Sequence, residues 1–316
     1  MPDSPISATP YEVLGVSPTS TQDELRRAYR RMLRLTHPDT GGDSTRFTLV
    51  QLAWERVGAP DDRAAYDRGA PRRGDGFASS SSPSGSASWA TPSAAQRARP
   101  ADTRPRSRAF GHPGGWRRER YLTLLREWVG RGTDIADPYD PALVRTVPRE
   151  IRHNLADALA EEQTARQLAE LGIGWTIWHD VATGAPDQKL DHVVLGPTGL
   201  FAIMSEDYGE VVTVKRGELT SASLGQARPI HELALRAKAL TRSMRVKFTA
   251  LVICLPDDAL DEPLVDLGRI RGAAAIAVRS SYLPGFLRAG LPGLDVVDGT
   301  QLFDVRTKLQ AGIRFV

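Results

Sequence analysis

The chain has 316 residues, a formal net charge of +3 at pH 7 and a single cysteine. Its length favours two domains over one, because single domains usually hold about 100–200 residues. One cysteine excludes an intramolecular disulfide framework and any Cys-rich zinc module, and it indicates a reducing compartment. No apolar run approaches the ~20 residues of a membrane helix. We therefore expect a cytoplasmic protein that does not contact the membrane.

A strongly patterned helix is predicted from Gln22 to Thr36. Thr21 before it and Glu24 in its first turn fit a capping box, in which each side chain bonds the backbone amide of the other residue. One face is apolar and carries Leu25, Ala28, Tyr29 and Met32. Another face is basic and carries Arg27, Arg30, Arg31 and Arg34, with Arg26 beside it. Like charges at these spacings repel each other, so this face is either simply solvated or a surface for an acidic partner.

The segment after this helix is predicted to be a turn. Pro38 disfavours helical geometry at His37, and Gly41 and Gly42 allow a tight return of the chain. A second apolar pattern with helical spacing follows, made by Phe47, Val50, Trp54 and Val57. We therefore expect an antiparallel helical hairpin with a polar, exposed tip.

Taken together, these features resemble a DnaJ-type J domain in order and spacing, from about Thr9 to Gly69. The segments that carry the resemblance are Tyr11–Val16, the capped basic helix, His37-Pro38-Asp39, Phe47 to Trp54, and Asp62–Asp67. The resemblance implies an all-α four-helix J domain, which we place at residues 1–70. Trp54 departs from the pattern, since a tyrosine is typical there.

The resemblance also implies a partner. J domains dock their central hairpin on a DnaK-type chaperone ATPase. The resemblance implies that His37, Pro38 and Asp39 would stimulate that ATPase, and that the basic face with Arg26 would supply docking contacts. The ATP chemistry belongs to the partner. The Gly/Phe-rich and Cys-rich regions of full DnaJ proteins are absent from the sequence, so selection of the unknown client must come from residues 116–316.

Residues 71–115 change in character. Large aliphatic residues are scarce there, and Ser, Pro, Gly, Ala and Arg dominate. Such a segment cannot bury enough apolar area to offset its conformational entropy. We predict a disordered basic linker, which serves either as a solvated tether or as a weak, non-specific contact for nucleic acid or another anionic surface.

Residues 116–316 show mixed periodicity, which predicts an α/β domain with an N-terminal helical extension. We expect helices at Trp116–Val129, Leu155–Leu171, Ile230–Met244 and Gly299–Gly312. We expect strands at Trp175–His179, Asp191–Leu195, Leu200–Met204, Val211–Val214, Phe248–Leu255 and Ala273–Val278.

Three carboxylates form the candidate site of this domain. Glu161 lies on the long predicted helix, Asp191 opens one strand, and Glu206 follows the next strand. A Gly196–Gly199 turn would pair the two strands and bring Asp191 near Glu206. Carboxylates placed in this way would suit Mg²⁺ or Mn²⁺, which could activate water for phosphodiester hydrolysis.

The region resembles the nuclease-related domain, whose fold is similar to restriction endonucleases and has a mixed sheet. The segments that carry the resemblance are the helix from Glu161 to Leu171, Trp178–Val181, Leu190–Ile203 and Pro229–Glu232. In that family an aspartate precedes a Glu-x-Lys motif, and a glutamate on a helix lies nearby. Asp191 and Glu161 match those positions.

The rest of that family's site is altered in this chain. Met204 stands in place of the metal-binding glutamate, Glu206 in place of the lysine, and Glu232 where a glutamine is expected. A thioether is a poor ligand for a hard cation, and the missing lysine removes a charge that would position water. Lys189, Lys215 and Lys238 could each supply a displaced lysine, although no position favours one of them.

We therefore expect a J-domain co-chaperone that recruits a DnaK-type ATPase to cargo bound by an inactive nuclease-like domain. No cofactor is expected in that case. A metal-dependent nuclease regulated by the J domain is the alternative, and it would use Mg²⁺ or Mn²⁺ at Asp191 and Glu206. A third possibility is nucleic-acid binding without cleavage.

Overall fold

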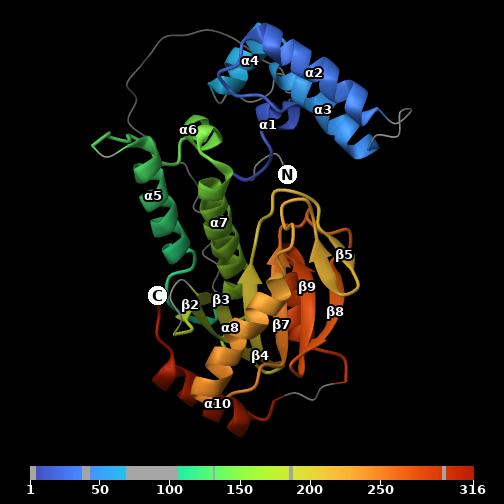
Figure 1. Ribbon diagram of the computed structural model, residues 1–316. Helices are drawn as coiled ribbons and strands as arrows, with labels where there is room; N and C mark the ends of the chain where they lie inside the picture. Colours follow the sequence, from blue (N-terminus) through green and yellow to red (C-terminus); the bar gives the residue numbers. More distant parts are fainter. Residues whose placement is uncertain (1–4, 38–42, 69–105, 131, 185–187, 294–296) are drawn as a thin grey trace, which may run out of the picture. The chain divides into compact units, whose positions relative to one another are not determined.

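The structure is a computed structural model that describes residues 5–37, 43–68, 106–130, 132–184, 188–293 and 297–316 (Figure 1). The chain divides into two compact units. The helical unit comprises Thr9–Arg104, and the sheet unit comprises Met1–Ala8 together with Pro105–Val316. The predicted linker lies largely outside the described residues, which stop at 68 and resume at 106.

The helical unit contains four helices around a small apolar core, as the sequence predicts. They are α1 (Pro10–Leu14), α2 (Gln22–Thr36), α3 (Ser44–Val57) and α4 (Pro60–Asp67). Leu14, Leu25 and Val57 are fully buried in this core. The predicted capping box is confirmed, because Thr21 N–H donates to Glu24 Oε2 (2.8 Å) and Glu24 N–H donates to Thr21 Oγ1 (3.3 Å).

A seven-stranded mixed sheet forms the centre of the sheet unit, and its strand order is β1-β2-β3-β4-β7-β9-β8. These strands are β1 (Arg108–Phe110), β2 (Thr176–Ala182), β3 (Lys189–Gly196), β4 (Gly199–Ser205), β7 (Ala250–Leu255), β8 (Leu264–Ile270) and β9 (Ala273–Arg279). Strand β3 is antiparallel to both β2 and β4, whereas β4, β7 and β9 are mutually parallel. A separate hairpin pairs β5 (Thr213–Lys215) with β6 (Glu218–Thr220).

Helices cover both faces of this sheet (Figure 1). Helices α8 (Pro229–Met244) and α10 (Gly299–Gly312) pack on one face, whose core includes Val193, Leu251 and Leu309. Helix α7 (Arg149–Ala169), the short helix η2 (Ser280–Tyr282) and α9 (Leu283–Ala289) belong to the other face. Helix α5 (Gly115–Val129) packs on α7, and α6 (Pro141–Thr146) precedes α7.

The predicted linker extends too far in one respect. Residues 106–115 belong to the sheet unit, because Arg108–Phe110 form edge strand β1, which pairs in parallel with β2. All three residues of β1 are exposed. They therefore show no hydrophobic alternation, which is the signal by which a strand is normally predicted from sequence. The edge strand β8, helix α9 and the short elements α6 and β6 were likewise not predicted.

The domain boundary at the N-terminus also differs from the prediction of a J domain at residues 1–70. Residues 5–8 pack in the sheet unit, where Ile6 is buried. Arg152 Nη1 donates to the carbonyl oxygens of Pro5 (3.2 Å) and Ser7 (3.3 Å). Gly209 has a φ of +70°, and a Cβ atom there would lie 2.8 Å from Ile6 Cγ2, so this approach requires glycine. The helical unit therefore begins at Thr9, the N-cap of α1.

Within the described part of the chain, no helix combines the length and the apolar character needed to cross a bilayer.

Candidate functional site

The helical unit presents its arginines to solvent. Arg26, Arg27, Arg30, Arg31 and Arg34 are all exposed on α2, whereas Leu25 and Ala28 on the opposite face are buried. Tyr29 stacks on Trp54 of α3, with ring centroids 4.4 Å apart. The apolar stripe therefore holds the helical hairpin together, which leaves the arginine face for solvent or a partner.

The predicted ATPase-stimulating tripeptide is described only in part. His37 is the C-cap of α2, and its ring packs edge-on against Phe47 at 5.1 Å. Pro38 and Asp39 lie outside the described residues. The role of His37, Pro38 and Asp39 remains a prediction from the resemblance.

A buried lysine lies at the centre of the nuclease-like site. Lys189 Nζ contacts Glu161 Oε2 at 2.6 Å, Asp180 Oδ1 at 2.7 Å and Asp191 Oδ1 at 2.9 Å. We call these four residues the lysine cluster, and each of them is at most 3% exposed. Of the three lysines considered from the sequence, Lys189 is thus the one next to Asp191. The absence of a lysine from the site, one of the grounds for expecting inactivity, therefore does not hold.

Local geometry explains why these residues meet. Lys189 and Asp191 are two positions apart on β3, and alternate residues of a strand share a face. Asp180 of β2 has φ +51°, which is unusual for a residue other than glycine. Trp178 and Val181, three positions apart, pack in the same apolar core, so the alternation of faces shifts across Asp180. Strained backbone of this kind often occurs at functional sites.

The N-terminus of α5 closes the lysine cluster. Gly114 N–H donates to Glu161 Oε2 (3.1 Å), and Trp116 N–H donates to Asp180 Oδ2 (3.3 Å). Carboxylates are favourable at this end of a helix, where backbone N–H groups lack partners within the helix. Gly114 has φ +74°, and a Cβ atom there would lie 2.7 Å from the carbonyl oxygen of Ala158. The close packing of α5 on α7 therefore depends on glycine at this position.

Arg117 belongs to a neighbouring set of charges. Its Nη2 atom lies 3.3 Å from Asp157 Oδ2 and 4.0 Å from Glu206 Oε1. His153 Nε2 lies 3.4 Å from Asp157 Oδ2 and 4.0 Å from Glu206 Oε2. We call Arg117, His153, Asp157 and Glu206 the arginine cluster. The two clusters adjoin where Arg117 Nε lies 3.8 Å from Glu161 Oε1.

The carboxylates of the two clusters differ in pKa, because burial raises the pKa of most of them, whereas neighbouring positive charges lower that of Asp191. In the arginine cluster, burial raises the pKa of Asp157 to about 7 and that of Glu206 to about 8, although Arg117 opposes both shifts. Burial also raises the pKa of Glu161. For Asp191 burial acts in the same direction, but Lys189, His192 and Arg117 together bring its pKa below the usual value. Asp191 is therefore the carboxylate most firmly held in its ionised form.

The described side chains do not balance these charges. Five carboxylates, namely Glu161, Asp180, Asp191, Asp157 and Glu206, surround two permanent cations, Lys189 and Arg117. Buried charges are costly unless they are compensated. Protons on the carboxylates with raised pKa values, or a bound cation, would restore the balance.

The two clusters differ in their capacity for a divalent ion. Asp191 already uses both oxygens, because Oδ1 meets Lys189 and Oδ2 accepts a hydrogen bond from Ser205 N–H (2.9 Å). By contrast, Glu161 Oε1 and both carboxylate oxygens of Asp157 accept no hydrogen bond from the described residues. The oxygen atoms open to a metal therefore lie mainly in the arginine cluster.

The predicted trio of carboxylates is brought together only in part. Glu161 and Asp191 share Lys189, whereas Glu206 lies with Arg117 and His153. Met204, at the position of the family's metal-binding glutamate, is buried in the apolar core, and Arg236 Nη1 lies 3.6 Å from its sulfur. Lys215 lies on β5 of the separate hairpin, and Lys238 lies on α8.

The sequence reasoning missed His153, Asp157, Asp180 and Arg117. A helical signal was available for two of them, because His153, Asp157 and Glu161 follow each other at four-residue spacing and so share one face of α7. Asp180 and Arg117 offer no comparable signal, since tertiary packing alone brings them to the site.

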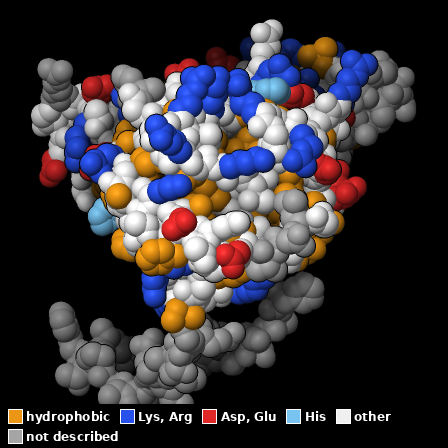
Figure 2. Space-filling model, turned by 90° about the horizontal axis from the view of Figure 1, so that it is seen from below, with side chains coloured by type: hydrophobic (Ala, Val, Ile, Leu, Met, Phe, Trp, Pro, Cys, Tyr) orange, Lys and Arg blue, Asp and Glu red, His pale blue; other side chains and the backbone are white. Residues whose placement is uncertain are grey.

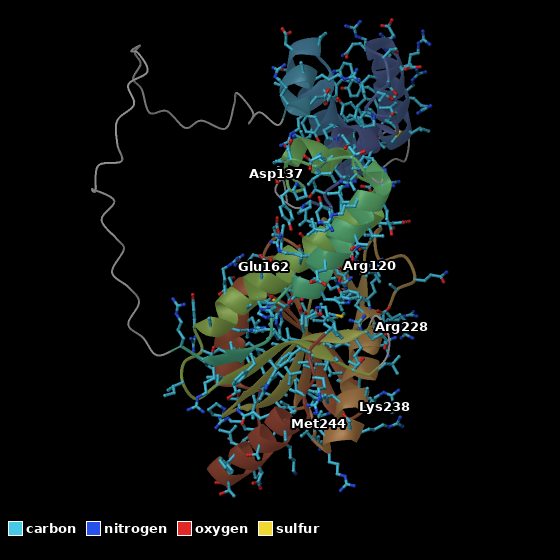
Figure 3. The ribbon with its side chains drawn as sticks, turned by 90° about the vertical axis from the view of Figure 1, so that its left-hand side faces the viewer. Arg120, Asp137, Glu162, Arg228, Lys238 and Met244 are labelled. Carbon is cyan, nitrogen blue, oxygen red and sulfur yellow. The ribbon has the colours of Figure 1, made fainter. Side chains whose placement is uncertain are left out.

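A basic surface lies elsewhere on the sheet unit. Arg242 and Arg271 lower the pKa of Lys238 by like-charge repulsion. Lys238 projects outward from α8, and Figure 2 shows Lys and Arg side chains spread over the face seen from below. On the opposite side of the sheet, Glu162 lies on α7 (Figure 3). It pairs with Arg118, whose Nη2 lies 2.9 Å from Glu162 Oε2. This basic surface is compatible with a polyanion, without indicating a sequence preference.

Known proteins match the chain in two separate regions. Residues 9–67 match the family model of the DnaJ domain, and residues 156–255 match that of the nuclease-related domain. A DnaJ protein homolog from Cucumis sativus is 43% identical over 58 residues, which cover 18% of this chain and 14% of the relative. The chaperone protein DnaJ of Gloeothece citriformis is 46% identical over 61 residues, which cover 18% and 16%.

A third relative, the chaperone protein DnaJ of Leifsonia xyli subsp. xyli, is 45% identical over 62 residues, which cover 19% of this chain and 17% of the relative. The chain thus spans less than a fifth of the length of these three relatives. Their similarity is confined to the helical unit, and the nuclease-related match falls in the sheet unit. The chain therefore carries an N-terminal DnaJ domain followed by a C-terminal nuclease-related domain.

Proposed function

We propose that the protein is a J-domain co-chaperone that stimulates a DnaK-type chaperone ATPase at a cargo held by its sheet unit. The observation that carries this proposal is the α2 surface, where five arginines are exposed although nothing in the folding of the helix requires them. A helix that needed only solubility could mix acids with bases. A face of one sign is instead suited to an acidic partner.

The DnaJ match supports the same conclusion. It covers the complete four-helix unit, including the arginines and the His37–Asp39 tripeptide. In the proposed mechanism, α2 docks on the ATPase and Asp39 engages it at the tip of the hairpin. The segment between the two domains keeps the ATPase at a raised local concentration near the cargo.

The test is to measure single-turnover ATP hydrolysis by a DnaK-type ATPase with the full-length protein. We expect stimulation by the wild type, loss of stimulation in Asp39→Asn, and a marked loss in the double variant Arg27→Ala/Arg30→Ala. Arg68→Ala is the matched control, because Arg68 is also exposed but lies after α4. Absence of stimulation by the wild type, or full stimulation by Asp39→Asn, would contradict the proposal.

A metal-dependent nuclease is the second candidate, and the position of Lys189 favours it. The ammonium group lies 2.9 Å from Asp191, the aspartate that matches the nuclease-related pattern. Its three N–H groups are taken by Glu161, Asp180 and Asp191, so the ammonium group would hold water or a phosphate oxygen, and stabilise negative charge that develops during phosphodiester cleavage, only once one of these carboxylates releases it. Lys189 would therefore substitute for the lysine that the family carries at the position of Glu206.

A divalent cation would supply Lewis-acid activation of water and phosphate in such an enzyme. Glu161 could contribute its open oxygen Oε1, and Asp157 could contribute both of its carboxylate oxygens. Lys189 keeps Asp191 ionised, and the amide groups of Gly114 and Trp116 orient the carboxylates of Glu161 and Asp180.

Incubation with single- and double-stranded DNA and RNA in Mg²⁺ or Mn²⁺ tests this candidate. An active nuclease is expected to lose cleavage in Asp191→Asn and in Lys189→Met, and to keep it in Asp304→Asn, which alters an exposed carboxylate on α10. Circular dichroism establishes that each variant is folded. Cleavage that persists in folded Asp191→Asn would place any nuclease activity outside this site.

A further inference from the structure

We propose that His153, Asp157 and Glu206 form a binding site for one Zn²⁺ ion, separate from the lysine cluster. One ligand atom from each of the three residues lies within 4.8 Å of the other two. His153 and Asp157 are four positions apart on α7, and Glu206 directly follows β4. The site therefore joins a helix to the sheet on which that helix packs.

The separations between donor atoms fit a zinc ion. Zinc lies about 2.0–2.2 Å from imidazole nitrogen and carboxylate oxygen, so two ligands at a tetrahedral angle are roughly 3.4 Å apart. His153 Nε2 lies 3.4 Å from Asp157 Oδ2 and 4.0 Å from Glu206 Oε2. The ligand atoms of Asp157 and Glu206 lie within 4.8 Å of each other, so Glu206 would have to move towards the other two ligands to complete the set.

The state of Asp157 is the independent observation that points to a ligand. Its side chain is completely buried, yet neither oxygen accepts a hydrogen bond from the described residues. Buried polar atoms are normally hydrogen-bonded, because an unsatisfied acceptor loses the solvation that water provided. An ion bound by Asp157 would remove this deficit.

Arg117 already places a positive charge near the same two carboxylates, Asp157 and Glu206. Its guanidinium Nη2 lies 3.3 Å from Asp157 and 4.0 Å from Glu206, but the Asp157 oxygens accept no hydrogen bond from it and the Glu206 contact is too long for one. Arg117 thus provides charge without satisfying the oxygen atoms. A zinc ion would provide both, so the ion and the guanidinium compete for Asp157.

The donor set favours zinc over magnesium. An imidazole nitrogen suits zinc, whereas Mg²⁺ prefers oxygen ligands and keeps much of its water. The side chain of His153 is 34% exposed, which gives the ion a route from solvent. With three protein ligands, the fourth coordination position is left for water or for an oxygen atom of a bound anion.

Isothermal titration of the untagged, chelator-treated, full-length protein with ZnCl₂ tests this site. We expect one ion per chain, and at least tenfold weaker binding in His153→Gln. Arg117→Met is expected to bind Zn²⁺ more tightly, because the competing cation is gone. That gain would not follow if Arg117 and the carboxylates had a purely structural role.

His231→Gln is the matched control. His231 Nε2 lies 2.8 Å from Glu218 Oε1 at the protein surface, and this pair could also bind zinc. Equal binding by wild type and His153→Gln, or loss of binding in His231→Gln, would overturn the proposal. Loss in Asp191→Asn with retention in His153→Gln would also overturn it, since the ion would then lie in the lysine cluster.

This inference does not rest on nuclease activity. Binding of Zn²⁺ that requires His153, together with no cleavage of any nucleic acid, would leave the site established and the nuclease candidate rejected. Substitution with Co²⁺ gives a second readout, because its visible absorption spectrum depends on the ligands. We expect that spectrum to change in His153→Gln and to be unchanged in His231→Gln.

Discussion

The two domains differ in where their charged side chains lie: on the surface of the helical unit and in the interior of the sheet unit. On α2 the five arginines are all exposed, and the buried face of that helix is apolar. In the sheet unit, six carboxylates are buried together with Lys189 and Arg152, and Arg117 is only 18% exposed. Exposed charges cost little because water solvates them, whereas buried charges must be balanced by neighbours.

This difference indicates where binding is expected to perturb the fold. A partner can bind the arginine face of α2 without rearranging the core beneath it. A ligand at the buried clusters must instead replace a proton, a lysine or an arginine that already balances the carboxylates. Stability of the sheet unit should therefore respond strongly to charge and pH, and stability of the helical unit weakly.

Lys189→Met is expected to lower the free energy of unfolding more than any other change considered. This change leaves three buried carboxylates without their shared cation, and breaking a buried ion pair in this way costs about 3–5 kcal/mol. Urea unfolding at pH 7 measures the loss. Lys238→Met, at a half-buried position on α8 outside the lysine cluster, is the control and should have little effect. A small effect of Lys189→Met would mean that the carboxylates are already neutral.

The pH dependence of stability should be the next largest effect. Asp157 and Glu206 have folded-state pKa values of about 7 and 8, above those expected in the unfolded chain. The histidines His153, His179 and His192 have pKa values lowered by burial and act in the opposite direction, but only below about pH 7, where histidines of the unfolded chain take up protons. From about pH 7 to 8 the folded state therefore binds more protons, so stability falls as pH rises, by on the order of 1 kcal/mol. Glu206→Gln should flatten this decline. Thermal unfolding monitored from pH 7 to 9 measures it, and a stability that rises over this range would contradict the prediction.

At lower pH, Asp191 should make stability increase with pH, which is opposite to the effect of Asp157 and Glu206. Its pKa is lowered in the folded state, so its contribution to stability is present above the unfolded pKa and is lost as the pH falls through the folded value. Acid unfolding below about pH 4 would report this loss. Asp191→Asn should shift that acid transition, whereas Asp304→Asn should not.

A smaller effect is expected at the N-terminus of α2. Thr21→Ala removes the side-chain acceptor for Glu24 N–H and should destabilise the helical unit by about 1 kcal/mol. Thr21→Ser retains the hydroxyl group and should restore most of this loss. Hydrogen exchange of the α2 amides measures the change, and equal exchange in Thr21→Ala and wild type would show that the cap contributes nothing.

The smallest effect on stability is expected from Arg30→Ala. Surface substitutions usually change stability by less than about 0.5 kcal/mol, and here the change also removes repulsion from neighbouring arginines. Stimulation of the ATPase should nevertheless decrease. A large loss of stability in this variant would mean that the arginine face is part of the fold, and the contrast between the two domains would fail.

Local patterns in the sequence predicted most of the fold. The capping box at Thr21, the apolar face of α2 and the buried strands around Val193 and Phe201 all follow from spacing alone. The edge strands β1 and β8 were missed because most of their side chains are exposed or half-buried, so neither shows a continuous apolar run.

The site was predicted less completely for a physical reason. Glu161 and Asp191 were identified from their places on the predicted helix and strand, the resemblance then matched both, and strand alternation could have placed Lys189 beside Asp191. Arg117 is contributed by α5, a different helix from the one that carries Glu161, and Asp180 reaches the site through a left-handed backbone conformation. Neither feature has a local signature in the sequence.

The anchoring of residues 5–8 has a consequence for how the two domains can be separated. Topologically, the helical unit is an insertion between Ala8 and Pro105 of the sheet unit. Deleting everything before residue 105 therefore also removes Ile6 and the carbonyl groups bound by Arg152. A deletion that replaces Thr9–Arg104 by a flexible linker can keep those contacts if the linker spans most of the length of α7, because residues 5–7 bind at Arg152 and Ser107 N–H donates to the Ala169 carbonyl, about 25 Å further along that helix. A difference between the two deletions would isolate what the short N-terminal segment contributes to the sheet unit.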